Sequence, residues 1–110
     1  MIIVIDYGIG NLRSILSKFE RLKIEAKISS SIKDIQQAEK LILPGVGHFG
    51  AAMSNLCQSD LIPAIEEQVL GRQIPLLGIC LGMQLLTRGS EESDQPGLGW
   101  IDGETRKFSF

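Results

Sequence analysis

The sequence predicts an α/β fold in which a mostly parallel sheet carries helices on both faces. Short apolar runs alternate along the chain with segments whose apolar residues recur at helical spacing, and the connections between them are short. The first run, residues 2–6 (IIVID), is β-branched and continuous, as expected for a strand that is covered on both faces. This order of elements is typical of parallel strands joined by helical crossovers.

Four apolar runs have the length and composition of strands. They cover residues 2–6, 24–28, 40–45 and 74–79. The second alternates polar and apolar residues, which is typical of a strand near the edge of a sheet, and the third stops at Pro44 and Gly45. After a turn-rich segment at 92–99, we expect residues 100–110 to hold one or two antiparallel strands.

The segments between these runs predict helices. They cover residues 12–22, 32–38, about 50–57, about 60–71 and 81–89. Asn11 is placed to cap the first helix, and Ser30 or Ser31 the second. Pro63 is tolerated in the first turn of the fourth helix, which ends at Gly71, its expected C-cap.

Length and composition indicate one globular domain, residues 1–110. Hydrophobic residues make up 44% and charged residues 22%, which argues against disorder. A formal charge of −2 offers no basic footprint for nucleic acid, and no apolar stretch approaches the roughly 20 residues needed to cross a membrane. The amino terminus lacks the features of a secretion signal, and two cysteines do not make a disulfide framework, so we expect a cytoplasmic location.

Three loops with the composition of functional sites directly follow predicted strands. They are residues 6–11 (DYGIGN), residues 44–50 (PGVGHFG) and the turn at Cys80. Because the carboxyl ends of parallel strands lie along one rim of a sheet, we expect these loops to meet there and form an active site.

The segment Gly78-Ile79-Cys80-Leu81-Gly82 has the form G-x-C-x-G between a predicted strand and a predicted helix. This is the cysteine version of a nucleophile elbow, in which glycines on either side permit a tight turn. The following helix presents its N-terminal amides to the sulfur and favours the thiolate, and the Leu81 amide can donate to an oxyanion. The alternative is a small buried thiol beside packing glycines.

The loop at 44–47 (PGVG) is by itself an ordinary turn, but beside an elbow it can supply the second N–H of an oxyanion hole. His48 in the same loop is the only histidine of the chain and so the only imidazole that could activate Cys80. A histidine that packs in the loop or faces solvent is the simpler interpretation.

The other candidate groups each have a plain explanation. Gly8 and Gly10 suggest a dinucleotide fingerprint, but Arg13 stands where its third glycine belongs. Asn11 begins a segment that can bind phosphate or a partner at a helix N-terminus, although capping alone explains it. Cys57, at a helix end without a glycine turn, is expected to be a half-buried structural thiol.

Gln84 lies four residues after Cys80, on the same face of the predicted helix, so it can reach the site or simply lie on the surface. A group of acidic residues follows: Glu91, Glu92 and Asp94. By default this group is a solvated loop, unless the substrate carries an ammonium group.

Three segments together resemble the class I (triad) glutamine amidotransferases. They are DYGIGNLRS (6–14), LILPGVGHFG (41–50) and GICLGMQLL (78–86). The first two are typical of the glutaminase subunits of imidazole glycerol phosphate synthase, which supply ammonia in histidine biosynthesis. The resemblance covers the whole chain in order and implies a flavodoxin-like fold.

The resemblance also implies roles for single residues. Cys80 would attack the side-chain amide of L-glutamine to form a thioester and release ammonia, with the oxyanion held by the amides of Leu81 and Val46. The residues implied to contact glutamine are Gly45, Gly47, Gln84 and Glu92, with Glu92 suited to the α-ammonium group. Asn11 would belong to the face that docks on a barrel-shaped cyclase subunit, forming a heterodimer; no metal or cofactor is implied.

One departure from the family matters. Its members are roughly twice as long and carry the histidine and the acidic partner of the triad in a carboxyl-terminal H-P-E-type motif, which this sequence lacks. We therefore expect an N-terminal part of a glutaminase with little activity alone. An uncovered strand edge would also favour self-association.

Three alternatives remain open on the sequence. The chain can serve a different amidating synthase, such as one that acts on a surface sugar. It can be a scaffold that keeps the docking face without catalysis. A DJ-1-like cysteine hydrolase shares the elbow, but Gln84 and the loop at 44–47 suit glutamine better.

Overall fold

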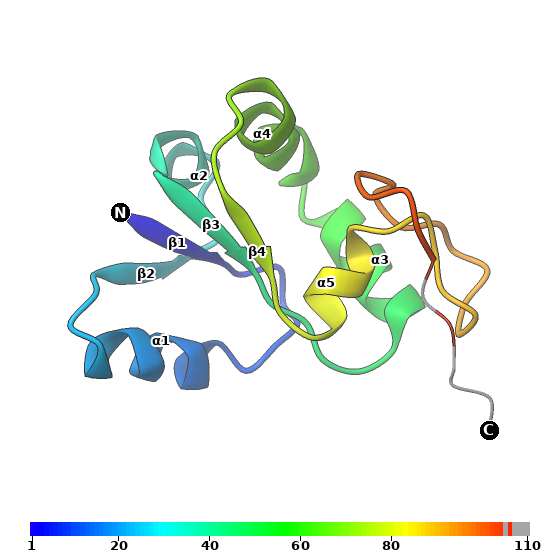
Figure 1. Ribbon diagram of the computed structural model, residues 1–110, viewed down its shortest axis with the longest axis horizontal. Helices are drawn as coiled ribbons and strands as arrows, with labels where there is room; N and C mark the ends of the chain where they lie inside the picture. Colours follow the sequence, from blue (N-terminus) through cyan, green and yellow to red (C-terminus); the bar gives the residue numbers. More distant parts are fainter. Residues whose placement is uncertain (105, 107–110) are drawn as a thin grey trace.

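The computed structural model describes residues 1–104 and 106 and shows one parallel sheet flanked by helices (Figure 1). The strands are β1 (Ile2–Ile5), β2 (Ala26–Ser29), β3 (Lys40–Leu43) and β4 (Leu76–Gly78). They are arranged in the order β2-β1-β3-β4, and every pairing is parallel. The predicted α/β class with a parallel sheet is confirmed.

The helices follow the strands in the predicted order. They are α1 (Leu12–Arg21), α2 (Ile32–Gln37), α3 (Phe49–Gln58), α4 (Ile62–Glu66), its π-helical continuation η1 (Glu67–Gly71), and α5 (Leu81–Leu85). Figure 1 shows α1 on one side of the sheet and α2 and α4 on the other. No helix in the described part of the chain has the length and apolar character that a membrane span requires.

The core lies on one face of the sheet. Side chains alternate along each strand, so Ile3 and Ile5 of β1 and Leu41 and Leu43 of β3 point to the same side. They pack there against apolar residues of α2, α3, α4 and α5. Val4 and Ile42 point to the opposite face, where α1 contributes no fully buried residue. The sheet is thus covered thickly on one side and thinly on the other.

The second strand begins two residues later than predicted, because the end of α1 uses the preceding residues. Lys23 adopts a left-handed conformation (φ 58°), its amide donates to Glu20 O, and the Ile24 amide donates to Phe19 O. This is the Schellman pattern that usually has glycine at its left-handed position. Ile24 therefore closes the helix, and the strand starts at Ala26.

Several predicted helix ends also differ. Asn11 occupies the N-cap position of α1 but makes no capping hydrogen bond, whereas Ser31 accepts one from the Asp34 amide. The fourth helix widens into a π-helical turn, and its C-cap is Arg72, not Gly71. The first difference leaves the Asn11 side chain available on the surface.

The last helix ends at Leu85, four residues earlier than predicted. The amides of Leu98 and Ile101 donate to the carbonyls of Leu85 and Leu86, so a returning loop takes the place of further helical turns. Residues 100–104 and 106 form no strand, and the rest of the strand region predicted over 100–110 lies outside the described residues.

The outer edge of β4 pairs with no other strand among the described residues. Beside it, on the face that α1 covers thinly, lies an apolar groove of about 250 Å³ whose lining includes Phe19, Ile42 and Leu77. Leu77 is 56% exposed although it lies within a strand. An open strand edge next to an exposed apolar groove is a surface on which proteins associate.

We propose that the chain self-associates through this edge and groove. Sedimentation velocity at increasing protein concentration is expected to show dimers, and Leu77→Ser is expected to shift the distribution to monomer. Leu70→Ser is the matched control, because Leu70 is also half exposed but lies on η1, away from this groove. A monomer at all concentrations, or equal effects of the two substitutions, would contradict the proposal.

Candidate active site

The three predicted loops lie together at the carboxyl end of the sheet. β1 pairs with β3 and β3 with β4 in parallel register, which aligns the loops that follow them. Two hydrogen bonds join the loops directly: Tyr7 Oη donates to Pro44 O, and the Leu81 amide donates to Gly45 O. The structure therefore brings the loop after β1, the loop after β3 and Cys80 onto one rim.

Cys80 occupies a sharp turn between β4 and α5. Its backbone has φ 54° and ψ −121°, a combination that costs a non-glycine residue roughly 1–3 kcal/mol. Hydrogen bonds from Gly82 N to Ile79 O and from Met83 N to Cys80 O hold the turn at 2.9 and 3.0 Å. The Cys80 side chain is exposed, so the alternative of a buried thiol is wrong. A strained backbone that presents a thiol to solvent is the geometry of a nucleophile elbow.

The glycines around Cys80 are required by contact with backbone. A Cβ on Gly82 would lie 1.9 Å from Leu43 O, and one on Gly78 would lie 2.7 Å from Met83 Cα. A Cβ on Gly45 would lie 2.7 Å from Gly82 N. The elbow and the loop after β3 are therefore packed backbone against backbone, which explains why all three positions carry glycine.

Of the two amides expected in an oxyanion hole, that of Leu81 is already hydrogen-bonded within the protein. The Leu81 N–H donates to Gly45 O at 3.2 Å and so is occupied by the protein itself. Val46 follows that carbonyl, and its side chain is 54% exposed. Because the Gly45 carbonyl and the Val46 N–H belong to one peptide unit, one rotation of this unit would release the Leu81 amide and redirect the Val46 amide.

The His48 side chain is engaged at the start of α3. Its Nδ1 accepts from the Gly50 amide at 3.1 Å, which makes His48 the N-cap of α3. Its Nε2 lies 3.7 Å from Glu92 Oε1, and the same oxygen accepts from the Phe49 amide at 2.6 Å. His48 and Glu92 together cap α3, which agrees with the interpretation of His48 as a loop-packing residue.

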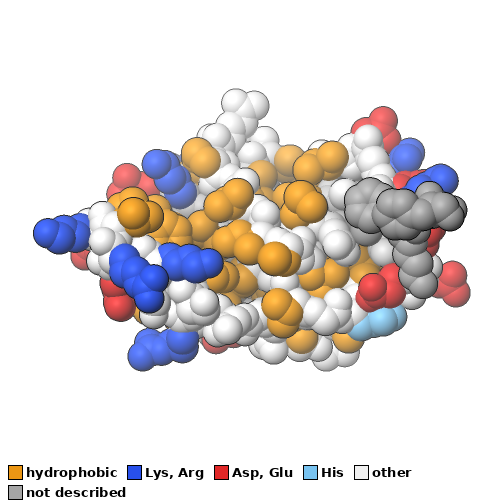
Figure 2. Space-filling view, turned by 60° about the horizontal axis from the view of Figure 1, so that its bottom comes forward, with side chains coloured by type: hydrophobic (Ala, Val, Ile, Leu, Met, Phe, Trp, Pro, Cys, Tyr) orange, Lys and Arg blue, Asp and Glu red, His pale blue; other side chains and the backbone are white. Residues whose placement is uncertain are grey.

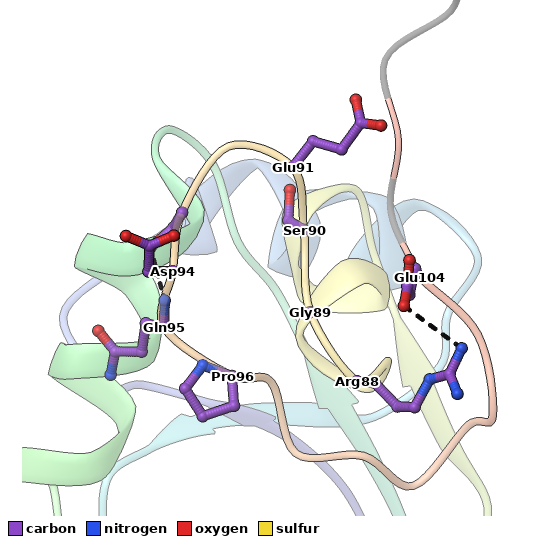
Figure 3. Close-up of a pocket in the computed structure, with 9 residues that line it drawn as sticks. Arg88, Gly89, Ser90, Glu91, Asp94, Gln95, Pro96 and Glu104 are labelled. Atoms are coloured by element: carbon purple, nitrogen blue, oxygen red, sulfur yellow. Dashed lines mark hydrogen bonds and ion pairs between the residues drawn. The ribbon is translucent and has the colours of Figure 1, made fainter.

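The acidic residues do not act as one group. Glu92 turns toward α3, whereas Glu91 and Asp94 line a separate pocket of about 400 Å³ together with Arg88 and Glu104 (Figure 3). Arg88 pairs with Glu104 across this pocket at 3.5 Å. Cys80 is not among the residues that line it. The pocket therefore belongs to the loop after α5 and not to the elbow.

The remaining candidates lie in the loop after β3, on α5 or on the surface of α3. Gly47 has φ 93° with open space around it, next to exposed Val46. Gln84 is half buried on α5, one turn after Cys80. Cys57 is exposed, which corrects the prediction of a half-buried thiol; its position at the solvent face of α3 is the reason. Among the described residues, no group of His, Cys, Asp and Glu is arranged to hold a metal ion.

Tyr7 is a residue of the rim that no sequence motif singled out. This residue is buried at the end of β1, and its hydroxyl donates to Pro44 O. Burial raises the pKa of Tyr7 to about 12, so the hydroxyl keeps its proton and stays a donor at neutral pH. Tyr7 is the only tyrosine of the chain and directly precedes Gly8 in the first loop, which is the signal that was available.

The contact between Gly82 and Leu43 predicts a large effect on stability. Gly82→Ala is expected to lower the free energy of unfolding by about 3 kcal/mol, because its Cβ meets a backbone oxygen that cannot move aside. Gly89→Ala is the control, since nothing lies within 4 Å of its Cβ position. Urea denaturation followed by circular dichroism measures both; equal effects would contradict the packing described.

The backbone of Cys80 predicts a second effect. Cys80→Gly is expected to be more stable than Cys80→Ala by about 1 kcal/mol. Glycine adopts the positive φ of this position without strain, whereas alanine retains the strain. Both variants lose the thiol, so the comparison isolates the backbone. The same denaturation measurement applies, and an alanine variant as stable as the glycine variant would show that the turn is unstrained.

Comparison with known proteins agrees with this geometry. The family model described as glutamine amidotransferase class-I matches residues 3–93. Imidazole glycerol phosphate synthase subunit HisH 2 of Pseudomonas aeruginosa is 52% identical over 108 residues, which are 98% of this chain and 54% of that protein. A second relative, subunit HisH 2 of Methanococcus maripaludis, is 47% identical over the whole chain and 54% of its own length.

A solved structure titled as a glutamine amidotransferase shares the fold, with a TM-score of 0.76 and 21% identity over 94% of this chain and 55% of that one. The chain thus spans about half the length of the relatives that it matches. The family model covers most of the chain, including the elbow and all three loops of the rim. The chain belongs to the class-I glutamine amidotransferase family.

Proposed function

We propose that the chain is the N-terminal part of a glutaminase subunit of imidazole glycerol phosphate synthase. The observation that carries the proposal is the exposed thiol of Cys80 on a strained turn between β4 and α5. The relatives named as subunits of that synthase support the choice among amidotransferases. The enzyme would work in the cytoplasm without a metal or cofactor.

The proposed reaction begins at Cys80. Its sulfur adds to the amide carbon of the L-glutamine side chain, and the carbon–nitrogen bond then breaks to leave a thioester. The proton of the thiol goes to the departing nitrogen, so ammonia is released; water then hydrolyses the thioester to glutamate and restores the thiol. His48 is engaged as the cap of α3, so the group that carries the proton is proposed to come from outside the described residues.

Stabilisation of the tetrahedral intermediates requires a change in the loop after β3. The Leu81 amide is bonded to Gly45 O, and an oxyanion needs that amide free. Rotation of the peptide between Gly45 and Val46 would free it and bring the Val46 amide beside it. The exposed Val46 side chain and the open space around Gly47 leave room for this rotation.

Glutamine is proposed to lie between this loop and α5. Gly45 and Gly47 would let the backbone approach the substrate. The side-chain amide of Gln84, one turn after Cys80 on α5, would donate a hydrogen bond to glutamine or accept one from it. Glu92 would bind the α-ammonium group. In this structure its carboxylate accepts from the Phe49 amide, so substrate would have to compete for it.

The partner is proposed to be a cyclase subunit that receives the ammonia, docked on the rim that holds Cys80. Asn11 is exposed there and free of capping bonds. Figure 2 shows hydrophobic side chains gathered across the middle of one face of the molecule, with charged side chains of both signs toward its two ends. Exposed Val46 lies in the loop after β3 and exposed Met83 in the first turn of α5, and such apolar exposure suits a protein partner.

Covalent labelling tests the proposed nucleophile. The diazoketone analogue of L-glutamine is expected to modify Cys80 and leave Cys57 unmodified, because only Cys80 lies on the elbow, although both thiols are exposed. Iodoacetamide, which needs no recognition of glutamine, is the comparison and is expected to modify both. Peptide mass spectrometry reads out the result. Equal modification by the analogue, or none, would favour a non-catalytic scaffold.

A glutaminase assay tests the need for a further proton carrier. The chain alone is expected to turn over little glutamine, with or without an added cyclase subunit. Robust turnover by the chain alone would show that His48 or a second copy supplies the base. Ammonia transfer to a surface-sugar synthase, and not to the cyclase, would favour the other amidating pathway.

A further inference from the structure

We infer that Tyr7 is a positioning residue for the proposed reaction, holding the fixed end of the peptide segment that must rotate to form the oxyanion hole. The inference rests on the proposed function. It concerns a residue that does not touch substrate and acts through Pro44 and Gly45.

The first support is the bond from Tyr7 to the loop. Tyr7 Oη donates to Pro44 O at 2.5 Å, and both residues are buried. A buried carbonyl that loses its donor finds no water to replace it, so this bond restrains the loop strongly. Because the hydroxyl keeps its proton at neutral pH, the restraint does not depend on pH in the working range.

The second support is the space around Gly45. A Cβ at this position would lie 2.9 Å from Tyr7 Oη and 2.7 Å from Gly82 N. Gly45 is therefore enclosed between the tyrosine hydroxyl and the first turn of α5. The peptide before it cannot rotate without breaking the bond to Tyr7.

The third support is the contrast with the next residues. Val46 is exposed, and nothing lies within 4 Å of the Cβ position of Gly47. Among the described residues, the Gly45 carbonyl is held by one hydrogen bond, that from the Leu81 amide. The loop after β3 is thus held at Pro44 by Tyr7, whereas Val46 and Gly47 lie in open surroundings. This arrangement confines rotation to the single peptide between Gly45 and Val46, which carries the Val46 N–H and the carbonyl that occupies the Leu81 amide.

Tyr7 is itself held in place by α3 and by the core. Asn55 Nδ2 of α3 donates to Tyr7 O at 3.5 Å, and the ring is part of the main core. Tyr7, which holds the loop after β3, is therefore fixed to α3 and to the core face of the sheet. Without the hydroxyl, we expect the loop to sample many orientations, of which few align the two amides.

Tyr7→Phe in the full chain tests the inference, since it removes the hydroxyl and keeps the buried ring. Labelling of Cys80 by the diazoketone analogue is expected to slow at least about fivefold, the factor that corresponds to one buried hydrogen bond. Labelling by iodoacetamide is expected to stay unchanged. Exchange of the Leu81 amide, measured by NMR, is expected to accelerate, while the Ile79 amide, bonded to Leu43 O, stays protected.

Ser59→Ala is the matched control. Ser59 Oγ donates to Leu56 O at 2.6 Å, so the variant also loses a side-chain bond to a backbone carbonyl, but at the far end of α3. It is expected to change neither the ratio of the labelling rates by the diazoketone analogue and by iodoacetamide nor the hydrogen exchange of the Leu81 amide. If Tyr7 were merely structural, Tyr7→Phe would lower stability, as Ser59→Ala does, and would leave the ratio of the two labelling rates unchanged.

The outcomes separate the two proposals. If the unchanged chain is labelled selectively at Cys80 and Tyr7→Phe is labelled equally fast or faster, the inference about Tyr7 is overturned. If the unchanged chain is not labelled, the proposed function fails. In that case, accelerated Leu81 exchange in Tyr7→Phe still supports the anchoring of the loop, and unchanged exchange overturns it.

Discussion

The candidate site depends on one close contact, that of Gly82 with the end of β3. The α5 backbone approaches Leu43 O and Pro44 so closely that no Cβ fits between them. This approach places the first turn of α5 directly on β3, and Cys80 must then turn through a positive φ to connect β4 to the helix. The exposed thiol, the position of the Leu81 amide and the enclosure of Gly45 all follow from it.

The same close packing explains why the site is held in a resting arrangement. With α5 pressed against the loop after β3, the Leu81 amide finds the Gly45 carbonyl as its nearest acceptor. A polar group at the rim is more stable with a partner than without one. In the proposed oxyanion hole, the Leu81 amide is therefore occupied, and reorientation of one peptide, that between Gly45 and Val46, would free it.

The uneven cover of the sheet is a second constraint. The face toward α2, α3, α4 and α5 contains nearly all buried apolar side chains, whereas on the other face α1, which contacts β2, is the only helix among the described residues. β3 and β4 leave an apolar groove there, beside an unpaired edge. An open strand edge beside an apolar groove makes this side of the sheet the less completely packed one.

Prediction from sequence succeeded where the signal was local. The four strands and the order of helices follow from apolar periodicity, and the turn at Cys80 follows from glycines two residues to either side. Burial of β1 and β3 was evident because β-branched and aliphatic runs have no other stable environment in water. The sequence by itself thus determined the fold class, the rim that carries the site and the residue at its centre.

The tertiary structure decided the features that join distant segments. Tyr7 bonds to Pro44, Glu92 to the start of α3, and the segment near Leu98 to the end of α5. Each of these contacts spans more than ten residues, so no local pattern encodes it. The late start of β2 likewise arose because Lys23 takes a conformation usually reserved for glycine. Periodicity places residues on elements, but the partner of a polar group depends on which elements the packing brings together.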